Sequence, residues 1–169
     1  MWMRFTRALR SLCPASEISL VQVEDAQLIL IQGNCVTQSY LNKPILEALY
    51  GPMKIRCGLV RYKGTKVYGD GEDFITISYT LDMKATQTLH GHCWLEGEDG
   101  TVYDIATTVH EWYGVWSGTF IKAPNGKGVF EYEPFGDKYD EMLVGAYEHF
   151  RKEAGYPPDI IDAIRMAIT

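Results

Sequence analysis

Short hydrophobic runs with the two-residue period of β-strands fill the middle of this chain, and this feature restricts its fold most. The run FITISYT at 74–80 alternates clearly, and IRCGLVRY at 55–62 has a similar character. Further short strands are expected at 89–96, 101–106, 119–121 and 129–133. Because helical segments flank these closely spaced strands, the pattern predicts an α+β fold with an antiparallel sheet.

A helix is predicted over 35–50, directly after the chain-breaking pair Gly33-Asn34. Pro44 lies inside this segment and lacks a backbone N–H group, so we expect it to kink or split the helix near Asn42. The apolar run at 25–31 is short and ambiguous, and we interpret it as helical.

Helices are also expected at the C-terminus, over 138–169, where Asp140 is positioned to cap the first of them. The length of 169 residues fits a single domain, 1–169. Its catalytic core is expected over about 25–135.

Composition and charge exclude several classes of function. The net charge of −6 disfavours binding to a phosphate backbone, so we expect no nucleic-acid partner. No run of 18 apolar residues is present, which predicts that the chain does not span a membrane. The four cysteines are scattered without a CxxC pair and are interpreted as free thiols, which suggests a cytoplasmic protein.

Cys35, His92 and Asp104 are the residues most suited to chemistry. Cys35 opens a predicted helix, whose N-terminal partial charge stabilises a thiolate and whose unpaired N–H groups can bind an oxyanion. A thiol nucleophile then needs a base, usually histidine, and a carboxylate that orients the imidazole.

The hairpin around GEDG at 97–100 decides whether His92 and Asp104 can meet. A three-residue loop of Glu98, Asp99 and Gly100 makes paired positions sum to 198. In that register His92, Trp94 and Asp104 share one face, and the Asp104 carboxylate is a diagonal neighbour of His92. A loop longer by one residue would move Asp104 to the opposite face.

These residues occur in an order that resembles the transglutaminase-like branch of the papain-like cysteine enzymes. The shared features are a Gly-Asn-Cys helix start, a Gly-Pro turn, and the segments HCWLE and VYD, within 33–106. The resemblance implies a papain-like α+β fold with Cys35 as nucleophile, His92 as base and Asp104 as orienting group. It implies amide hydrolysis or acyl transfer on a protein or peptide substrate through an acyl-cysteine, with no cofactor.

Other residues are assigned to the reaction with less support from the pattern. Gln32 and Asn34, near the nucleophile, are candidate oxyanion donors beside the Cys35 backbone N–H group. Trp94, Trp112 and Trp116 are candidates for lining a substrate channel, although such aromatic clusters commonly form core.

Two alternatives remain open. The chain could be an inactive papain-like domain that binds a protein partner. It could also hold zinc through His90, His92 and Cys93, joined by Cys35, Cys57 or His110. Neighbouring strand residues point to opposite faces, so His92 and Cys93 would need a bulge to ligate one ion, and we predict no metal site.

Overall fold

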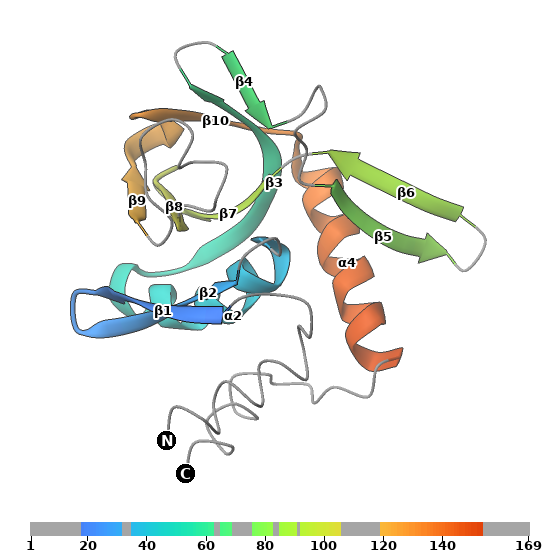
Figure 1. The fold of residues 1–169 in the computed structure, drawn as a ribbon, viewed down its shortest axis with the longest axis horizontal. Coiled ribbons are helices and arrows are strands. Elements are labelled where there is room, and N and C mark those ends of the chain that lie inside the picture. The colour runs from blue at the N-terminus through green and yellow to red at the C-terminus, as the bar shows by residue number, and fades with distance from the viewer. Residues whose placement is uncertain are drawn as a thin grey trace.

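The computed structural model describes residues 18–31, 35–62, 65–68, 76–82, 85–90, 92–105 and 119–153 (Figure 1). These residues form an α+β fold, which confirms the predicted α+β class. In chain order the elements are β1 (Ile18–Val23), β2 (Ala26–Ile31), α2 (Cys35–Tyr50), β3 (Met53–Tyr62), β4 (Thr65–Tyr68), β5 (Thr76–Asp82), β6 (Ala85–His90), β7 (His92–Gly97), β8 (Val102–Ile105), β9 (Phe120–Ala123), η1 (Pro124–Gly126), β10 (Phe130–Pro134) and α4 (Asp137–Glu153).

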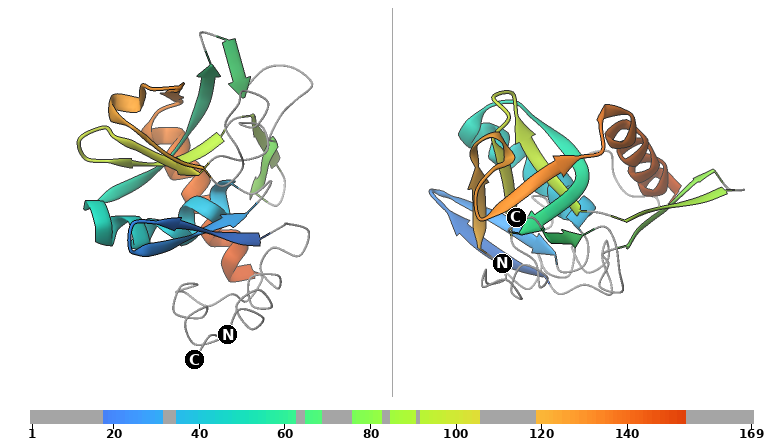
Figure 2. Two further views of the ribbon diagram at one scale, coloured as in Figure 1. Left: turned by 60° about the vertical axis from the view of Figure 1, so that its left-hand side comes forward. Right: turned by 90° about the horizontal axis from the view of Figure 1, so that it is seen from above.

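A curled antiparallel sheet organises the molecule. Its strand order is β10-β3-β7-β8-β9. A sixth strand, β4, also pairs with β3 but lies outside this linear order. The long strand β3 curves around the other strands, as Figures 1 and 2 show. Helix α2 packs against β2, β3 and β7, whereas α4 packs against β3 and β5. The strands β1-β2 and β5-β6 form separate two-stranded sheets.

The prediction of a helix at 25–31 is wrong, because this segment is strand β2. Its antiparallel pairing with β1 runs from Val23↔Ala26 to Ile18↔Ile31. The tight turn between the strands contains Glu24 at a positive φ of 50°. An apolar run of six residues is compatible with either helix or strand, and pairing with β1 decides the outcome.

Helix α2 has the predicted bounds, Cys35–Tyr50, and it continues through Pro44, so the predicted split does not occur. Asn42, where the split was expected, has another role. Its buried side-chain amide donates to the carbonyl of Ile29 at 2.6 Å and accepts from the backbone N–H of Ile29 at 2.7 Å. The asparagine therefore supplies β2 with the hydrogen bonds that a further strand would provide. Gly51 ends the helix at a φ of 92°.

The segment 89–96 was expected to be one strand, but the structure divides it between β6 and β7. Strand β6 pairs with β5, whereas β7 pairs with β3 and β8. The residue between the two strands, Gly91, is outside the described residues. The two strands belong to different sheets, a distinction that local alternation cannot indicate.

Helix α4 begins at Asp137, before the Asp140 cap that we predicted. Asp140 lies inside the helix and its side chain faces β3. One carboxylate oxygen accepts the backbone N–H of Cys57 at 2.8 Å, and the other accepts Arg56 at 2.7 Å. The cap assignment is therefore wrong: this carboxylate fastens the helix to the sheet. The last predicted helix, near 159–169, is outside the described residues.

The described side chains pack in clusters on both sides of the sheet. One cluster, beneath α2, includes Leu28, Leu46, Ile55 and Tyr103. A second, inside the curl, includes Val60, Trp94, Phe130 and Tyr132. Within the described part of the chain, no helix is both long and apolar enough to cross a membrane.

Candidate functional site

The hairpin between β7 and β8 has the predicted register. Leu95 pairs with Tyr103 and Glu96 with Val102, so each pair sums to 198. Gly100 adopts the left-handed conformation, with φ at 78°, that a three-residue loop requires. The hairpin prediction is therefore confirmed. It was possible because the loop residues and the strand alternation are local properties of the sequence.

This register brings His92 and Asp104 into direct contact. His92 Nε2 and Asp104 Oδ2 are 2.8 Å apart, and both side chains are buried. The second carboxylate oxygen, Oδ1, accepts the backbone N–H of Ile105 at 2.8 Å. Asp104 therefore holds the imidazole by Nε2, and Nδ1 is the nitrogen through which the ring can exchange protons with a thiol.

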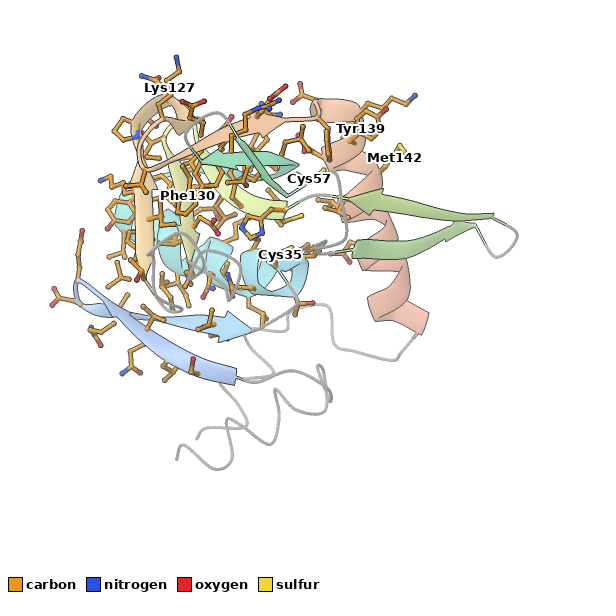
Figure 3. The ribbon with its side chains drawn as sticks, turned by 45° about the horizontal axis from the view of Figure 1, so that its top comes forward. Cys35, Cys57, Lys127, Phe130, Tyr139 and Met142 are labelled. Carbon is orange, nitrogen blue, oxygen red and sulfur yellow. The ribbon has the colours of Figure 1, made fainter. Side chains whose placement is uncertain are left out.

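Cys35 is the first residue of α2 (Figure 3), and its side chain interacts with that of His92. It packs with Cys57 of β3, Cys93 of β7 and Leu143 of α4. The first turn of α2 has no acidic side chain that would oppose a thiolate. Elements far apart in the sequence thus place the thiol beside the His92–Asp104 pair.

The electrostatics of the site favour a thiolate and an imidazolium. A hydrogen bond with Cys93 outweighs burial and, with the hydrogen bond and charge of His92, lowers the pKa of Cys35 from 9.0 to about 5. Burial opposes the charged form of His92, but the charge and hydrogen bond of Asp104, assisted by Cys35, raise its pKa from 6.5 to about 10. Around neutral pH the pair is therefore ionised.

The two neighbouring cysteines have the opposite character. Burial, followed by the charge of Asp140, raises the pKa of Cys57 from 9.0 to about 12. Burial and the hydrogen bond to Cys35 likewise raise the pKa of Cys93. Cys93 therefore acts as a thiol donor that stabilises the Cys35 thiolate. Strand alternation turns Cys93 to the face opposite to His92, yet Cys35 at the helix N-terminus interacts with both residues.

Tyr132 of β10 is a site residue that the sequence analysis missed. Its hydroxyl donates to Asp104 Oδ2 at 3.0 Å. Tyr132 lies in a short alternating strand, FEYEP, whose neighbours in sequence carry no chemical motif. Only the pairing of β10 with β3, which places Tyr132 opposite Val60, brings it to Asp104. No local signal could have identified it.

The remaining predicted site residues have different outcomes. Trp94 is fully buried, and its ring packs edge-on against Tyr132 at 5.1 Å between centroids, so it belongs to the core in this structure. Its indole Nε1 has no hydrogen-bond partner among the residues that the structure describes. The proposed oxyanion donors Gln32 and Asn34, and the proposed channel residues Trp112 and Trp116, lie outside the described residues.

The described residues contain no group of three or more His, Cys, Asp or Glu side chains arranged to hold a metal ion. The three described cysteines are all free and buried, and Cys57 and Cys93 face each other across β3 and β7. The zinc alternative started from a different set of residues, namely His90 and His92 together with Cys93.

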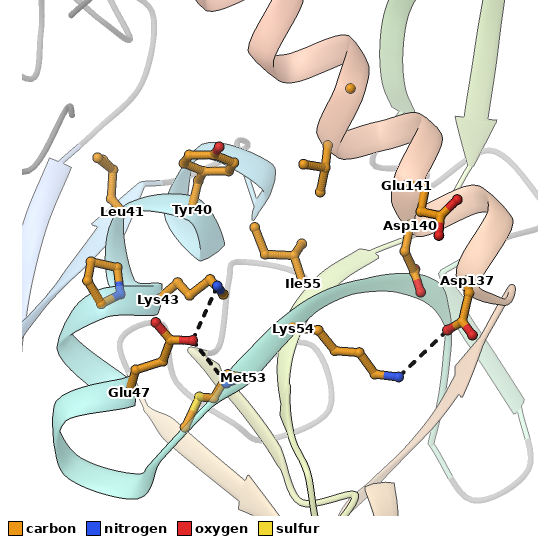
Figure 4. A pocket seen from close by; sticks show the side chains of 13 residues that line it. Tyr40, Leu41, Lys43, Glu47, Met53, Lys54, Ile55, Asp137, Asp140 and Glu141 are labelled. Carbon is orange, nitrogen blue, oxygen red and sulfur yellow. Dashed lines mark hydrogen bonds and ion pairs between the residues drawn. The ribbon is translucent and has the colours of Figure 1, made fainter. Parts of the chain in front are cut away.

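A separate pocket of about 950 Å³ lies between α2, β3 and α4 (Figure 4). Its apolar floor includes Leu41 and Ile55, and its rim carries the ion pairs Lys43–Glu47 and Lys54–Asp137, at 3.2 and 3.6 Å. Neither Cys35 nor His92 lines this pocket.

The arrangement of the thiol, imidazole and carboxylate has the chemical capacity for nucleophilic attack, since an ionised thiol lies beside a protonated base that is oriented by a carboxylate. Comparison with known proteins adds no further assignment: no protein-family model, curated protein or solved structure matches this chain.

Proposed function

We propose that the protein is a cysteine-dependent amide hydrolase or acyl transferase of the papain-like, transglutaminase-like type, with Cys35, His92 and Asp104 as its triad. The observation that carries the proposal is the His92–Asp104 contact of 2.8 Å beside a cysteine whose pKa is lowered to about 5. A structural cysteine buried in an apolar core would have a raised pKa, as Cys57 does.

In the proposed reaction the Cys35 thiolate attacks the carbonyl carbon of an amide and forms a C–S bond, while the carbonyl electrons move to oxygen. In this proposal, backbone N–H groups of the first turn of α2 stabilise the oxyanion. His92 then donates its Nδ1 proton to the departing nitrogen, the C–N bond breaks, and a thioester remains on Cys35.

The second half of the reaction restores the thiolate. Neutral His92 accepts a proton from water as the oxygen attacks the thioester, and the carboxylic acid product and the Cys35 thiolate separate. A primary amine can replace water and yields an amide instead. Asp104 holds the same ring nitrogen throughout, which keeps the imidazole in one orientation.

Burial of the site affects what can reach it. Cys35 exposes 1% of its surface and His92 none. Exclusion of water strengthens the interaction between the thiolate and the imidazolium. An extended protein or peptide substrate requires the site to open before it can bind, so a small probe is the better first test.

The proposal is tested with 4-nitrophenyl acetate, a small activated ester. We expect more than one equivalent of nitrophenolate per protein and an acetyl adduct that peptide mass spectrometry locates on Cys35. Cys35→Ala should abolish both signals, since no other group forms the acyl intermediate. Cys57→Ala is the matched control, because it removes a buried thiol from the same cluster and should retain turnover.

An adduct confined to another residue, or unchanged turnover in Cys35→Ala, would overturn the proposal. Adding methylamine to the same reaction separates the two branches. Acetate alone as product supports a hydrolase. N-methylacetamide supports a transferase only where it forms faster than with Cys35→Ala, which measures the direct reaction of the amine with the ester. A folded protein that forms no adduct would favour the binding-domain alternative.

A further inference from the structure

The Asp104 carboxylate has a second side-chain donor besides His92. Asp104 Oδ2 accepts from His92 Nε2 at 2.8 Å and from the Tyr132 hydroxyl at 3.0 Å. An ionised carboxylate can only accept hydrogen bonds, so the phenol must be the donor in this contact. Such a bond favours the ionised form of a buried carboxylate over its neutral form.

The position of Tyr132 is determined by packing on several sides. Its strand, β10, pairs with β3, and its ring meets the edge of Trp94 at an interplanar angle of 65°. Gly126, at a positive φ of 65°, leaves space beside it, since an added Cβ there would lie 3.3 Å from the Tyr132 carbonyl oxygen. Tyr132 is 9% exposed. The hydroxyl is therefore held in place by the fold.

Resting on the function proposed above, we propose that Tyr132 is a positioning residue, which holds the Asp104 carboxylate so that it keeps the His92 ring oriented beside Cys35. Without the phenol hydroxyl, the buried Asp104 charge is less screened, so it holds the proton on the His92 ring more tightly and is itself less firmly placed. The less screened negative charge also disfavours the nearby Cys35 thiolate. Tyr132 thus acts on the nucleophile through two intermediaries.

Several charged or titratable groups surround the Cys35–His92 pair. Besides Asp104 and Tyr132, they are Cys93 of β7, Cys57 of β3 and Asp140 of α4. Because interacting groups titrate together, the experiment measures changes in a shared pH profile rather than one isolated group.

The experiment uses iodoacetamide alkylation of Cys35 in the full chain as a function of pH, with Tyr132→Phe as the variant. This change keeps the ring and removes only the hydroxyl. We expect the acid limb of the profile to move up by about one pH unit, a tenfold change in the ratio of thiolate to thiol. The alkaline limb should also move up, because the less screened carboxylate holds the His92 proton more tightly.

Tyr103→Phe is the matched control, since Tyr103 is a buried tyrosine next to Asp104 that packs in the cluster beneath α2. Its profile should match the wild type. Asp104→Asn should instead move the alkaline limb down, because the imidazolium loses its counter-charge. Adding Tyr132→Phe to Asp104→Asn should cause no further shift, because Tyr132 acts through the carboxylate.

NMR titration of the His92 imidazole provides a second readout that needs no alkylation. The ring should lose its proton at higher pH in Tyr132→Phe than in the wild type. Unchanged alkylation limbs and an unchanged imidazole titration would overturn the positioning role, as would a full Tyr132→Phe shift in the Asp104→Asn background. Failure to form an acyl adduct, with the limbs moving as expected, would reject the proposed function and leave this role intact.

Discussion

The chemistry of the site depends on how a few buried residues share charge. A thiolate and an imidazolium are each costly to bury alone, and contact between them offsets part of that cost. Asp104 adds the negative charge that allows His92 to stay protonated. The same residues could be singled out from the sequence, because nucleophile, base and carboxylate are recognisable types at recognisable element ends.

The ionised pair should make stability depend on pH. The pKa of Cys35 falls from 9.0 to about 5 on folding, so its contribution is present above pH 9 and is lost as the pH falls towards 5. The pKa of His92 rises from 6.5 to about 10, so its contribution is present below pH 6.5 and is lost as the pH rises towards 10.

Between pH 6.5 and 9 the two effects have opposite slopes and cancel, so we expect a plateau in the free energy of unfolding, with a decline on each side. Urea unfolding at a series of pH values measures this profile. Cys35→Ala should lose the acid-side decline between pH 6.5 and about 5, since only the thiol contributes it. An identical acid limb in that variant would contradict the assignment.

At the level of elements, strand β3 connects the site to the rest of the sheet. Gly58 of β3 pairs with His92 on one side and with Pro134 of β10 on the other. A Cβ at Gly58 would lie 2.2 Å from the carbonyl oxygen of Glu133 and 2.7 Å from the Trp94 ring. The absence of a side chain therefore allows β10, and with it Tyr132, to approach the site.

Gly58→Ala should destabilise the protein by about 3 kcal/mol, the upper part of the usual range for overpacking, because the closest obstacle is backbone. Gly128→Ala is the matched control, since an added Cβ there meets only the Ala123 Cβ at 3.7 Å. Chemical denaturation measures both. A Gly58→Ala protein as stable as the control would show that β3 and β10 can separate at little cost.

Asn42 links α2 to the β1-β2 hairpin and offers a second prediction at this scale. Asn42→Ala leaves the buried N–H and carbonyl groups of Ile29 without these hydrogen bonds, so we expect a loss of about 2–4 kcal/mol. Gln22→Ala removes an exposed side-chain bond to the Glu24 carbonyl in the same hairpin and should change stability by less than about 0.5 kcal/mol. Equal unfolding midpoints for the two variants would refute the role of Asn42.

At the scale of the whole molecule, α4 is fastened to the sheet through Arg56 and Asp140. Arg56 contacts Glu96 at 3.1 Å, Asp137 at 2.6 Å and Asp140 at 2.7 Å. Of these partners, Asp140 is buried and also accepts the Cys57 backbone N–H. Leu143, one turn further along α4, packs beside Cys35. The helix thus closes the site from one side.

Asp140→Ala should cost about 2–4 kcal/mol, because it leaves a buried N–H group unpaired and removes a buried charge from Arg56. Asp137→Ala is a strict comparison, since Asp137 contacts the same guanidinium nitrogen but its side chain is 76% exposed. We expect that variant to lose less than about 1 kcal/mol. Thermal and urea unfolding test the contrast, and similar losses in both variants would contradict it.

The sequence by itself determined the α+β class, the bounds of α2 and the register of the β7-β8 hairpin. Each depends on neighbours within a few residues: a breaker before Cys35, a glycine after Tyr50, and a loop whose glycine accepts a positive φ. His92 and Asp104 lie on the two strands of that hairpin, so their contact was predictable as well.

Tertiary structure decided what depends on residues distant in the chain. Pairing with β1 made a strand of 26–31, and pairing of β10 with β3 carried Tyr132 to Asp104. Packing of α4 turned Asp140 from an expected cap into a buried partner of Cys57. Local patterns leave these choices nearly equal in energy, and the burial of surfaces and hydrogen-bonding groups between elements separates them.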